Sequence, residues 1–138
     1  MAVRFNHTLV HCRDKKASAA FLAEILGLPE PTSFGIFQVV HLEHDASMDF
    51  LDVGDAPITA QHYAFLIDEQ DFDPIFERVR ARGLDYWADP FKRQPGEINT
   101  RDGGRGVYFD DPDGHLLEVL TRPYGSGGDD GSTQGEPD

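Results

Sequence analysis

The stretch QHYAFLI at residues 61–67 indicates the fold, because it repeats the layout of NHTLV at residues 6–10. In both stretches an amide side chain precedes a histidine, and apolar residues follow. A helical pattern comes next in each case and ends at a glycine, Gly27 or Gly83, which can take the left-handed conformation that closes a helix. The step from histidine to glycine is 20 residues in one copy (7 to 27) and 21 in the other (62 to 83). The chain therefore contains an internal repeat.

Short strand-like runs follow both helical patterns. They lie at residues 37–42, 48–53, 107–109 and 116–121. Each half thus reads as strand, helix and strands, and a unit of this length buries one sheet face under its helix while its other face stays open. The repeat predicts an α+β fold, in which two βαβββ modules form a cleft-like pair of half-barrels.

Length and composition place both modules in one domain. A chain of 138 residues is long enough for one ordinary core and too short for two. We expect a single domain over residues 1–124, with module one at about 3–54 and module two at about 61–122. Residues 125–138 carry four acidic side chains, no basic ones and many Gly and Ser residues, which predicts a disordered acidic tail.

Charge and apolar patterning exclude several classes of protein. The formal net charge of -13 would repel a phosphate backbone, so nucleic acid is not an expected partner. No apolar run is long enough to cross a bilayer and the N-terminus lacks the layout of a secretory signal, which predicts a cytoplasmic protein without a membrane partner. The single cysteine, Cys12, is expected to be a small buried hydrophobe rather than a nucleophile.

Two histidines and one glutamate form a candidate metal site. His7 and His62 occupy equivalent places in the repeat, and they converge if a pseudo-twofold axis relates the modules. Glu118 stands among four apolar neighbours, which is costly unless its charge is paired or bound to a metal ion. Two imidazoles and one carboxylate make the facial triad that suits Fe(II), Mn(II) or related ions. The alternative is a hydrogen-bonded core histidine, or a glutamate at a sheet edge.

Other polar residues of the strands are weaker candidates. The histidines that fall near strand ends or turns are expected to be solvated, namely His41, His44 and His115. The segment around Asp49 resembles that around Glu118, so the repeat favours Asp49 as an extra ligand or a nearby acid, and Asp52 competes for the role. Because Asp49 and Asp52 must point to opposite faces of their strand, only one of them can look into the cleft.

Four stretches of the chain resemble one superfamily. They are NHTLV at 6–10, ILGL at 25–28, QHYAF at 61–65 and GVYFDDPDGHLLEV at 106–119. These stretches look like the glyoxalase, bleomycin-resistance and extradiol dioxygenase superfamily, which has the vicinal oxygen chelate fold, and the likeness spans about residues 3–124. The most specific mark is the DPDG turn followed by two apolar residues and Glu118, which indicates the fold and the metal site rather than the reaction.

Further stretches resemble a narrower branch of that superfamily. They are DF at 49–50, QHYAF at 61–65, GEIN at 96–99, GGRGVYF at 103–109 and TRPYG at 121–125. They resemble the branch that contains the ring-cleaving dioxygenase of chartreusin biosynthesis. That resemblance implies Fe(II) and an aromatic, oxygen-bearing substrate, with His7, His62 and Glu118 as the metal ligands.

The resemblance also implies roles around the metal. Tyr108 is a candidate proton donor or substrate hydrogen-bonding group, and its alternative role is that of a core aromatic. Four residues fall in the long connection of the second module, where a lid or pocket wall would contact substrate. These candidate substrate-binding residues are Trp87, Phe91, Asn99 and Arg105.

Several functions are compatible with this pattern. The leading hypothesis is an extradiol-type dioxygenase that brings an oxygenated aromatic small molecule and dioxygen together at Fe(II). A glyoxalase-type lyase or isomerase would use Zn(II) or Ni(II) and needs a fourth ligand such as Asp49 or Asp52. A thiol transferase would use the same three ligands with a basic pocket, which this acidic chain does not indicate. The rival from another class is a metal-free drug-binding protein, whose relatives typically lack the triad. In each case the exposed strand edges predict a homodimer.

Overall fold

The computed structural model describes residues 1–127, so residues 128–138, and with them most of the predicted acidic tail, lie outside the described residues. The chain divides into two compact units. Unit 1 comprises Met1–Thr59 with Asp111–Asp113, and unit 2 comprises Ala60–Asp110 with the residues from Gly114 onward. Each unit builds one four-stranded sheet and one α-helix, as the internal repeat predicts.

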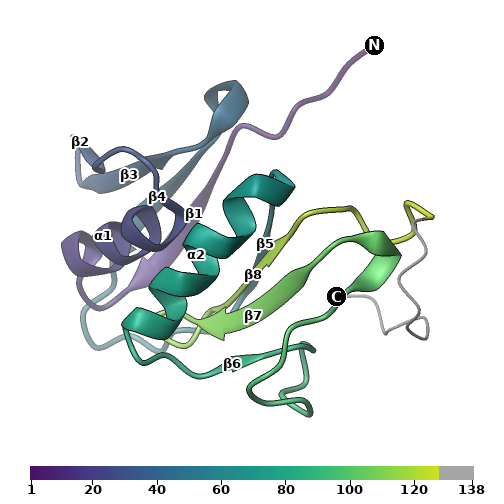
Figure 1. The fold of residues 1–138 in the computed structure, drawn as a ribbon. Helices are drawn as coiled ribbons and strands as arrows, with labels where there is room; N and C mark the ends of the chain where they lie inside the picture. The colour runs from purple at the N-terminus through teal and green to yellow at the C-terminus, as the bar shows by residue number, and fades with distance from the viewer. Residues whose placement is uncertain (128–138) are drawn as a thin grey trace. The chain divides into compact units, whose positions relative to one another are not determined.

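Unit 1 contains the first five elements of regular structure (Figure 1). They are β1 (His7–Cys12), α1 (Lys15–Leu26), β2 (Thr32–Phe34), β3 (Phe37–His41) and β4 (Ser47–Asp52). The strand order is β1-β4-β3-β2, with β1 parallel to β4 and the other neighbours antiparallel. A short 3-10 turn at Glu43–Asp45 joins β3 to β4.

Unit 2 repeats that arrangement. Its elements are β5 (His62–Leu66), α2 (Glu69–Ala81), β6 (Tyr86–Trp87), a 3-10 turn (Arg101–Gly103), β7 (Gly106–Asp110) and β8 (Leu116–Leu120). The strand order is β5-β8-β7-β6, with β5 parallel to β8 and the other neighbours antiparallel. The two units share one topology, so the predicted α+β fold of two βαβββ modules is confirmed.

Both helices end at the glycines that the sequence indicates. Gly27 has φ 70° and Gly83 has φ 70°, a left-handed conformation that costs glycine little. In each unit the residue after the glycine donates its backbone N–H to the carbonyl five residues earlier, at 2.8 Å after α1 and 3.2 Å after α2. These bonds satisfy carbonyl groups that would otherwise be left over at the helix ends.

The helix of unit 2 covers one face of its sheet (Figure 1). The buried face of α2 carries Phe72, Ile75 and Val79, and its Phe76 ring packs edge-on against Tyr86 with 5.0 Å between ring centroids. Successive side chains of a strand point to opposite faces of the sheet, so Trp87, which follows Tyr86, points away from α2. We call that face, away from α2, the open face of unit 2.

Unit 1 has the corresponding open face, away from α1. On the covered face Val10 and Cys12 of β1 are buried. The burial of Cys12 is as predicted, and it raises the pKa of the thiol to about 11, with smaller contributions from Asp113 and Asp52. Among residues 1–127 no helix is long and apolar enough to span a membrane.

Candidate metal centre

Glu118 lies in the middle of β8, on the open face of unit 2. Its cross-strand neighbours are Ala64 in β5 and Tyr108 in β7, and Tyr108 in turn pairs with Trp87. The side chain of Glu118 is 0% exposed. Burial of a carboxylate costs free energy unless nearby groups donate hydrogen bonds to it or a cation binds it.

His62 supplies one of those partners. It begins β5 and pairs with Leu116, two residues before Glu118, so both side chains lie on the open face. The distance from Nε2 of His62 to Oε1 of Glu118 is 3.0 Å. The imidazole is 26% exposed while the carboxylate is fully buried, so one side of the pair reaches the surface.

The donor atoms of this pair fit a divalent metal ion. Two ligand atoms that each lie about 2.1 Å from an ion, at a right angle to each other, are about 3.0 Å apart. That separation matches the distance between Nε2 of His62 and Oε1 of Glu118. One imidazole nitrogen and one carboxylate oxygen are also a donor set that Fe(II), Mn(II), Ni(II) and Zn(II) accept.

Two tyrosines and an arginine lie close to the carboxylate of Glu118. The hydroxyl of Tyr124 donates a hydrogen bond to Oε2 of Glu118, and it lies 3.0 Å from the hydroxyl of Tyr108. Nη1 of Arg101 donates to the Tyr108 hydroxyl at 3.5 Å, and the guanidinium carbon lies 5.2 Å from the centre of the Tyr124 ring. Burial by itself would lower the pKa of Arg101, but the two tyrosines outweigh it and raise the pKa.

Sequence reasoning assigned no role to Tyr124 or Arg101. Tyr124 belongs to the stretch TRPYG at residues 121–125, which follows β8. In the sequence this stretch indicated a family resemblance but no role for the tyrosine. Arg101 lies in a 3-10 turn, where no periodic pattern indicates which way a side chain points. Tyr108 was a candidate, and the structure places it fully buried beside Glu118, with its ring centroid 5.7 Å from that of His62.

The third predicted ligand, His7, begins β1 of unit 1. It pairs with Ser47, is exposed, and its Nδ1 lies 2.8 Å from Oδ1 of Asn6. His7 therefore holds in unit 1 the register position that His62 holds in unit 2. Within the described residues, neither unit taken by itself contains a group of three or more His, Cys, Asp or Glu side chains that could hold a metal ion. The role of His7 stays a prediction.

Asp49 and Asp52 lie on opposite faces of β4. Asp49 pairs with Leu9 on the open face of unit 1, which is the register position of Glu118 in unit 2, and its Oδ1 accepts a 2.8 Å hydrogen bond from Ser47. Asp52 pairs with Cys12 on the covered face and accepts the backbone N–H of Lys15 at the start of α1. Of the two acids, Asp49 is the one on the open face.

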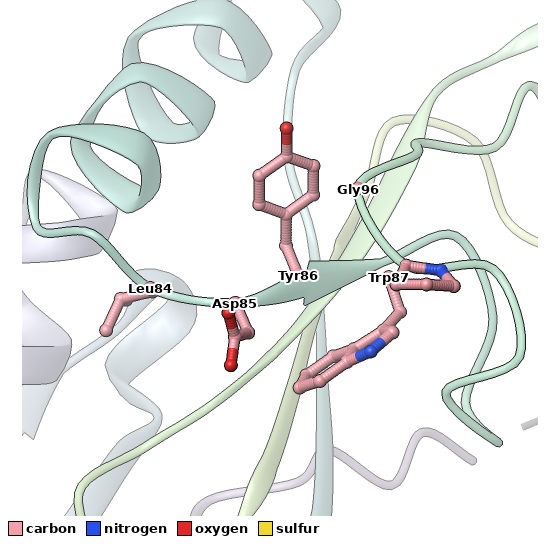
Figure 2. Close-up of a pocket in the computed structure, with 6 residues that line it drawn as sticks. Leu84, Asp85, Tyr86, Trp87 and Gly96 are labelled. Carbon is pink, nitrogen blue, oxygen red and sulfur yellow. The ribbon is translucent and has the colours of Figure 1, made fainter.

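Trp87 and Phe91 lie along the edge of unit 2. Trp87 shares the open face with Tyr108, and Nζ of Lys92 lies 4.5 Å from the centre of its ring. Phe91 is 53% exposed. Figure 2 shows the side chains of Tyr86 and Trp87 pointing to opposite sides of β6.

A pocket of about 340 Å³ opens at this edge strand. It is lined by Leu84, Asp85, Tyr86, Trp87, Pro95 and Gly96 (Figure 2). Neither His62 nor Glu118 lines it, so this pocket is separate from the pair that fits a metal. Trp87 is the residue that the pocket and the open face share.

Asn99 and Arg105 make contacts within unit 2. The side-chain amide of Asn99 donates to the carbonyl of Ala88 at 2.9 Å. The guanidinium of Arg105 binds Asp73 at 2.7 Å and Glu69 at 2.9 Å, both on α2 and therefore on the covered face. The hydrogen bond to Asp73, followed by the one to Glu69, raises the pKa of Arg105 against the effect of burial. A substrate contact for either residue stays a prediction.

His115 departs from what its position in the sequence indicates. It was expected to be solvated because it follows the DPDG turn, but it is only 1% exposed. Its Nδ1 accepts the backbone N–H of Gln61 at 3.0 Å, and its ring contacts that of Tyr63. The prediction was wrong because the turn brings the start of β8 against the start of β5, where the imidazole satisfies a backbone donor.

Comparisons with known proteins identify the family and the fold. The family model of the Glyoxalase/Bleomycin resistance protein/Dioxygenase superfamily matches residues 4–119. The solved structure of Oxidase ChaP-H1 is 62% identical with a TM-score of 0.87, covering 91% of this chain and 100% of that chain. Oxidase ChaP-H2 is 60% identical with a TM-score of 0.88, covering 93% and 100%. Both oxidases confirm the resemblance to the narrower, chartreusin-type branch.

A transferase is also similar to the chain. The Glutathione transferase FosA of Serratia marcescens is 30% identical over 126 residues, which cover 86% of this chain and 81% of that protein. The oxidases and the transferase each match most of the chain, so both modules are included in the similarity.

Proposed function

The chain belongs to the Glyoxalase/Bleomycin resistance protein/Dioxygenase superfamily, and from that premise we propose that it is a metal-dependent, extradiol-type dioxygenase acting on an oxygenated aromatic small molecule. The observation that carries the proposal is the fully buried carboxylate of Glu118, whose Oε1 lies 3.0 Å from Nε2 of His62. The high identity to two proteins named as oxidases supports the choice of an oxygenase among the reactions of the superfamily.

The proposed ligands are His7, His62 and Glu118, and the proposed ion is Fe(II). Bound Fe(II) would act as a Lewis acid toward the substrate oxygens and as an electron relay to dioxygen. His62 would offer the lone pair of Nε2, and Glu118 would offer Oε1. We propose His7 as the third ligand because it holds in unit 1 the register position of His62.

Tyr108 and Asp49 have supporting roles in this proposal. Tyr108 is fully buried and its hydroxyl is engaged by Tyr124 and Arg101, so it would stabilise the ligand carboxylate rather than contact the substrate. Asp49 is partly exposed on the open face of unit 1 and would serve as a nearby acid that accepts or returns a proton.

Aromatic side chains would bind the flat substrate. Trp87 lies on the same face as Glu118 and offers a ring for stacking, and the exposed Phe91 follows it in the chain. Lys92, 4.5 Å from the Trp87 ring centre and 2.7 Å from Asp110, holds the indole in place. A substrate that covers this aromatic surface would exclude water from it, which strengthens the electrostatic interactions next to it.

We also propose that the protein forms a homodimer. Both open faces carry apolar side chains that reach solvent, with Leu9 43% and Leu66 62% exposed. The open edge strands of so small a protein also favour pairing with a second subunit. Sedimentation equilibrium over a range of protein concentrations measures this directly, and a monomer at every concentration would contradict it.

The function is tested by anaerobic reconstitution with Fe(II). We expect about one ion per chain, and oxygen consumption with members of a panel of catechols and polycyclic quinols, followed by detection of a ring-opened product. Parallel reconstitution with Mn(II), Zn(II) and Ni(II) tests whether activity needs a redox-active ion, because Zn(II) cannot change its oxidation state.

Variants assign the activity to the proposed ligands. His62→Ala and Glu118→Ala should lose bound Fe(II) and oxygen consumption together. A matched control is His44→Asn, which removes an exposed histidine at φ 60°, a conformation that asparagine tolerates. Oxygen consumption at the wild-type rate in either ligand variant would refute the assignment.

A second candidate function is thiol transfer to an epoxide antibiotic. Its support is the 30% identity to Glutathione transferase FosA over most of the chain. The net charge of -13 disfavours an anionic drug as the acceptor. Incubation of the Mn(II)-loaded protein with glutathione and an epoxide, followed by mass spectrometry of the adduct, separates this activity from oxygen consumption.

A further inference from the structure

Hydrogen bonds join the chain after β8 to Asp102 and Arg105, which lie in the segment before β7. Residues 121–127, which we call the C-terminal strap, begin where Thr121 Oγ1 accepts the backbone N–H of Arg105 at 2.8 Å. The buried carboxylate of Asp102 then accepts the backbone N–H of Gly125 at 2.9 Å and that of Gly127 at 3.3 Å. The strap is therefore held at its beginning and at its end.

Tyr124 lies between these fastenings and reaches the candidate metal ligand. Its hydroxyl donates to Oε2 of Glu118, while Oε1 of the same carboxylate lies 3.0 Å from Nε2 of His62. The two oxygens of the carboxylate thus have different partners. Since the carboxylate is 0% exposed, water does not replace the tyrosine hydroxyl at Oε2.

The direction of the hydrogen bonds behind Glu118 follows from the chemistry of their members. A guanidinium only donates, and an ionised carboxylate only accepts. Each tyrosine hydroxyl has a single proton to donate. Arg101 therefore donates to Tyr108, Tyr108 donates to Tyr124, and Tyr124 donates to Glu118. The row of donors ends on Oε2.

We propose that Tyr124 is a positioning residue for the metal ligand, which rests on the proposed metal-dependent function. By holding Oε2, the Tyr124 hydroxyl prevents rotation of the Glu118 carboxylate and leaves Oε1 as the single oxygen presented beside His62. Through this hydrogen bond, the position of residues 121–127 would affect the affinity for the metal ion and would favour ligation through Oε1 alone. Partners of this kind, which contact a ligand rather than the ion, commonly affect metal affinity 10- to 100-fold, roughly.

The test is a Tyr124→Phe variant titrated with Co(II) under anaerobic conditions. The phenyl ring can remain under Arg101 while the hydroxyl is lost, so the variant removes the donor to Oε2 and, with it, the acceptor of the Tyr108 hydroxyl. We expect the Kd for Co(II) to rise about 10- to 100-fold. We also expect the visible spectrum of bound Co(II) to change, because a carboxylate released at Oε2 can bind through both oxygens.

Two further variants keep the test interpretable. Tyr86→Phe removes a hydroxyl on the covered face, where the ring packs on Phe76, and it should leave the Kd and the spectrum unchanged. Asp102→Asn loosens the strap without altering any side chain that touches Glu118, and it should raise the Kd by a smaller factor. If Tyr124→Phe does not fold, as judged by circular dichroism, the Kd of the Asp102→Asn variant for Co(II) decides the test.

The outcomes separate this proposal from the function on which it rests. If the wild type binds Co(II) and both Tyr124→Phe and Asp102→Asn bind it with the wild-type Kd and spectrum, the positioning role is overturned and the metal-dependent function stands. If the wild type binds neither Co(II) nor Fe(II), the metal-dependent function fails and the positioning role fails with it. Weaker binding in the two variants, with Tyr86→Phe unchanged, supports the positioning role.

Discussion

Units 1 and 2 have the same strand order but differ in the polar groups on their open faces. In each unit a histidine begins the first strand, and an acid lies in the middle of the strand beside it, so His7 corresponds to His62 and Asp49 corresponds to Glu118. Asp49 is partly exposed, whereas Glu118 is fully buried. The two acids therefore occupy equivalent positions in different environments.

The difference lies in the donors that surround each acid. Asp49 lies opposite Val39 on the neighbouring strand, while Glu118 lies opposite Tyr108. Tyr108 has a hydroxyl and Val39 has none, and the Tyr108 hydroxyl donates to Tyr124 of the strap, which in turn donates to Glu118. A carboxylate can be buried only where donors are within reach. Duplication of a strand layout thus does not by itself duplicate a site.

Exchange of each acid for its amide should give the largest difference between the two units. Glu118→Gln should weaken Co(II) binding by more than about 100-fold, because a neutral amide oxygen is a far poorer ligand than a carboxylate. Asp49→Asn should change the Kd by less than about 10-fold. Isothermal titration calorimetry measures both, and equal losses would mean that the two acids contribute alike.

Removal of the Tyr108 hydroxyl tests whether the donors of unit 2 stabilise the fold. Tyr108→Phe deprives the hydroxyl of Tyr124 of its donor and Arg101 of an acceptor. We expect the free energy of unfolding in urea to fall by about 1–2 kcal/mol. Tyr86→Phe, on the covered face, is the control and should cost less than about 0.5 kcal/mol. A Tyr108 variant as stable as this control would show that the network contributes little to folding.

The two units also differ in how their helices are capped. The carboxylate of Asp14 accepts the backbone N–H groups of Lys16 and Ala17 at 3.1 Å each, whereas the side chain of Asp68 makes no cap hydrogen bond to α2. Asp14→Ala should therefore lower the free energy of unfolding by about 1 kcal/mol, and Asp68→Ala by less than about 0.5 kcal/mol. Thermal unfolding measured for both variants under one condition checks the difference, and the reverse order would refute it.

Cys12 is a buried ionisable group of unit 1, and its burial favours the neutral thiol. Burial raises the pKa of its thiol from 9.0 to about 11, so the folded protein holds this proton more tightly than the unfolded chain. The stability contributed by the protonated thiol is present below pH 9 and is lost as the pH rises toward about 11. We expect alkylation by iodoacetamide at pH 8 to be slow in the folded protein and fast in urea. Similar rates in both states would contradict this.

The fold could be predicted because its signals are local. The histidine-to-glycine spacing marks both helices, and the left-handed conformation of Gly27 and Gly83 follows from the need to close a helix within one turn. The alternation of β4 likewise implied that Asp49 and Asp52 face opposite ways, and the register bears this out.

The candidate site could be predicted only in part. Glu118 was identifiable because a lone carboxylate in an apolar strand needs a partner, and His62 because it heads a repeated strand. Tyr124 and Arg101 were not identifiable, since both lie in irregular segments that have no periodicity to indicate a face. For the same reason His115 was expected in solvent, although it satisfies the backbone of Gln61.

Local signals in the sequence indicate that this chain forms two copies of one βαβββ topology and that the carboxylate of Glu118 needs a partner, because periodicity, turn residues and the cost of a buried charge are properties of short segments. Only the folded sheet shows which groups donate hydrogen bonds to that carboxylate. Arg101 reaches Tyr108, and Tyr124 reaches Glu118, from two separate irregular segments. Hydrogen bonds between such segments form only once the sheet of unit 2 has formed.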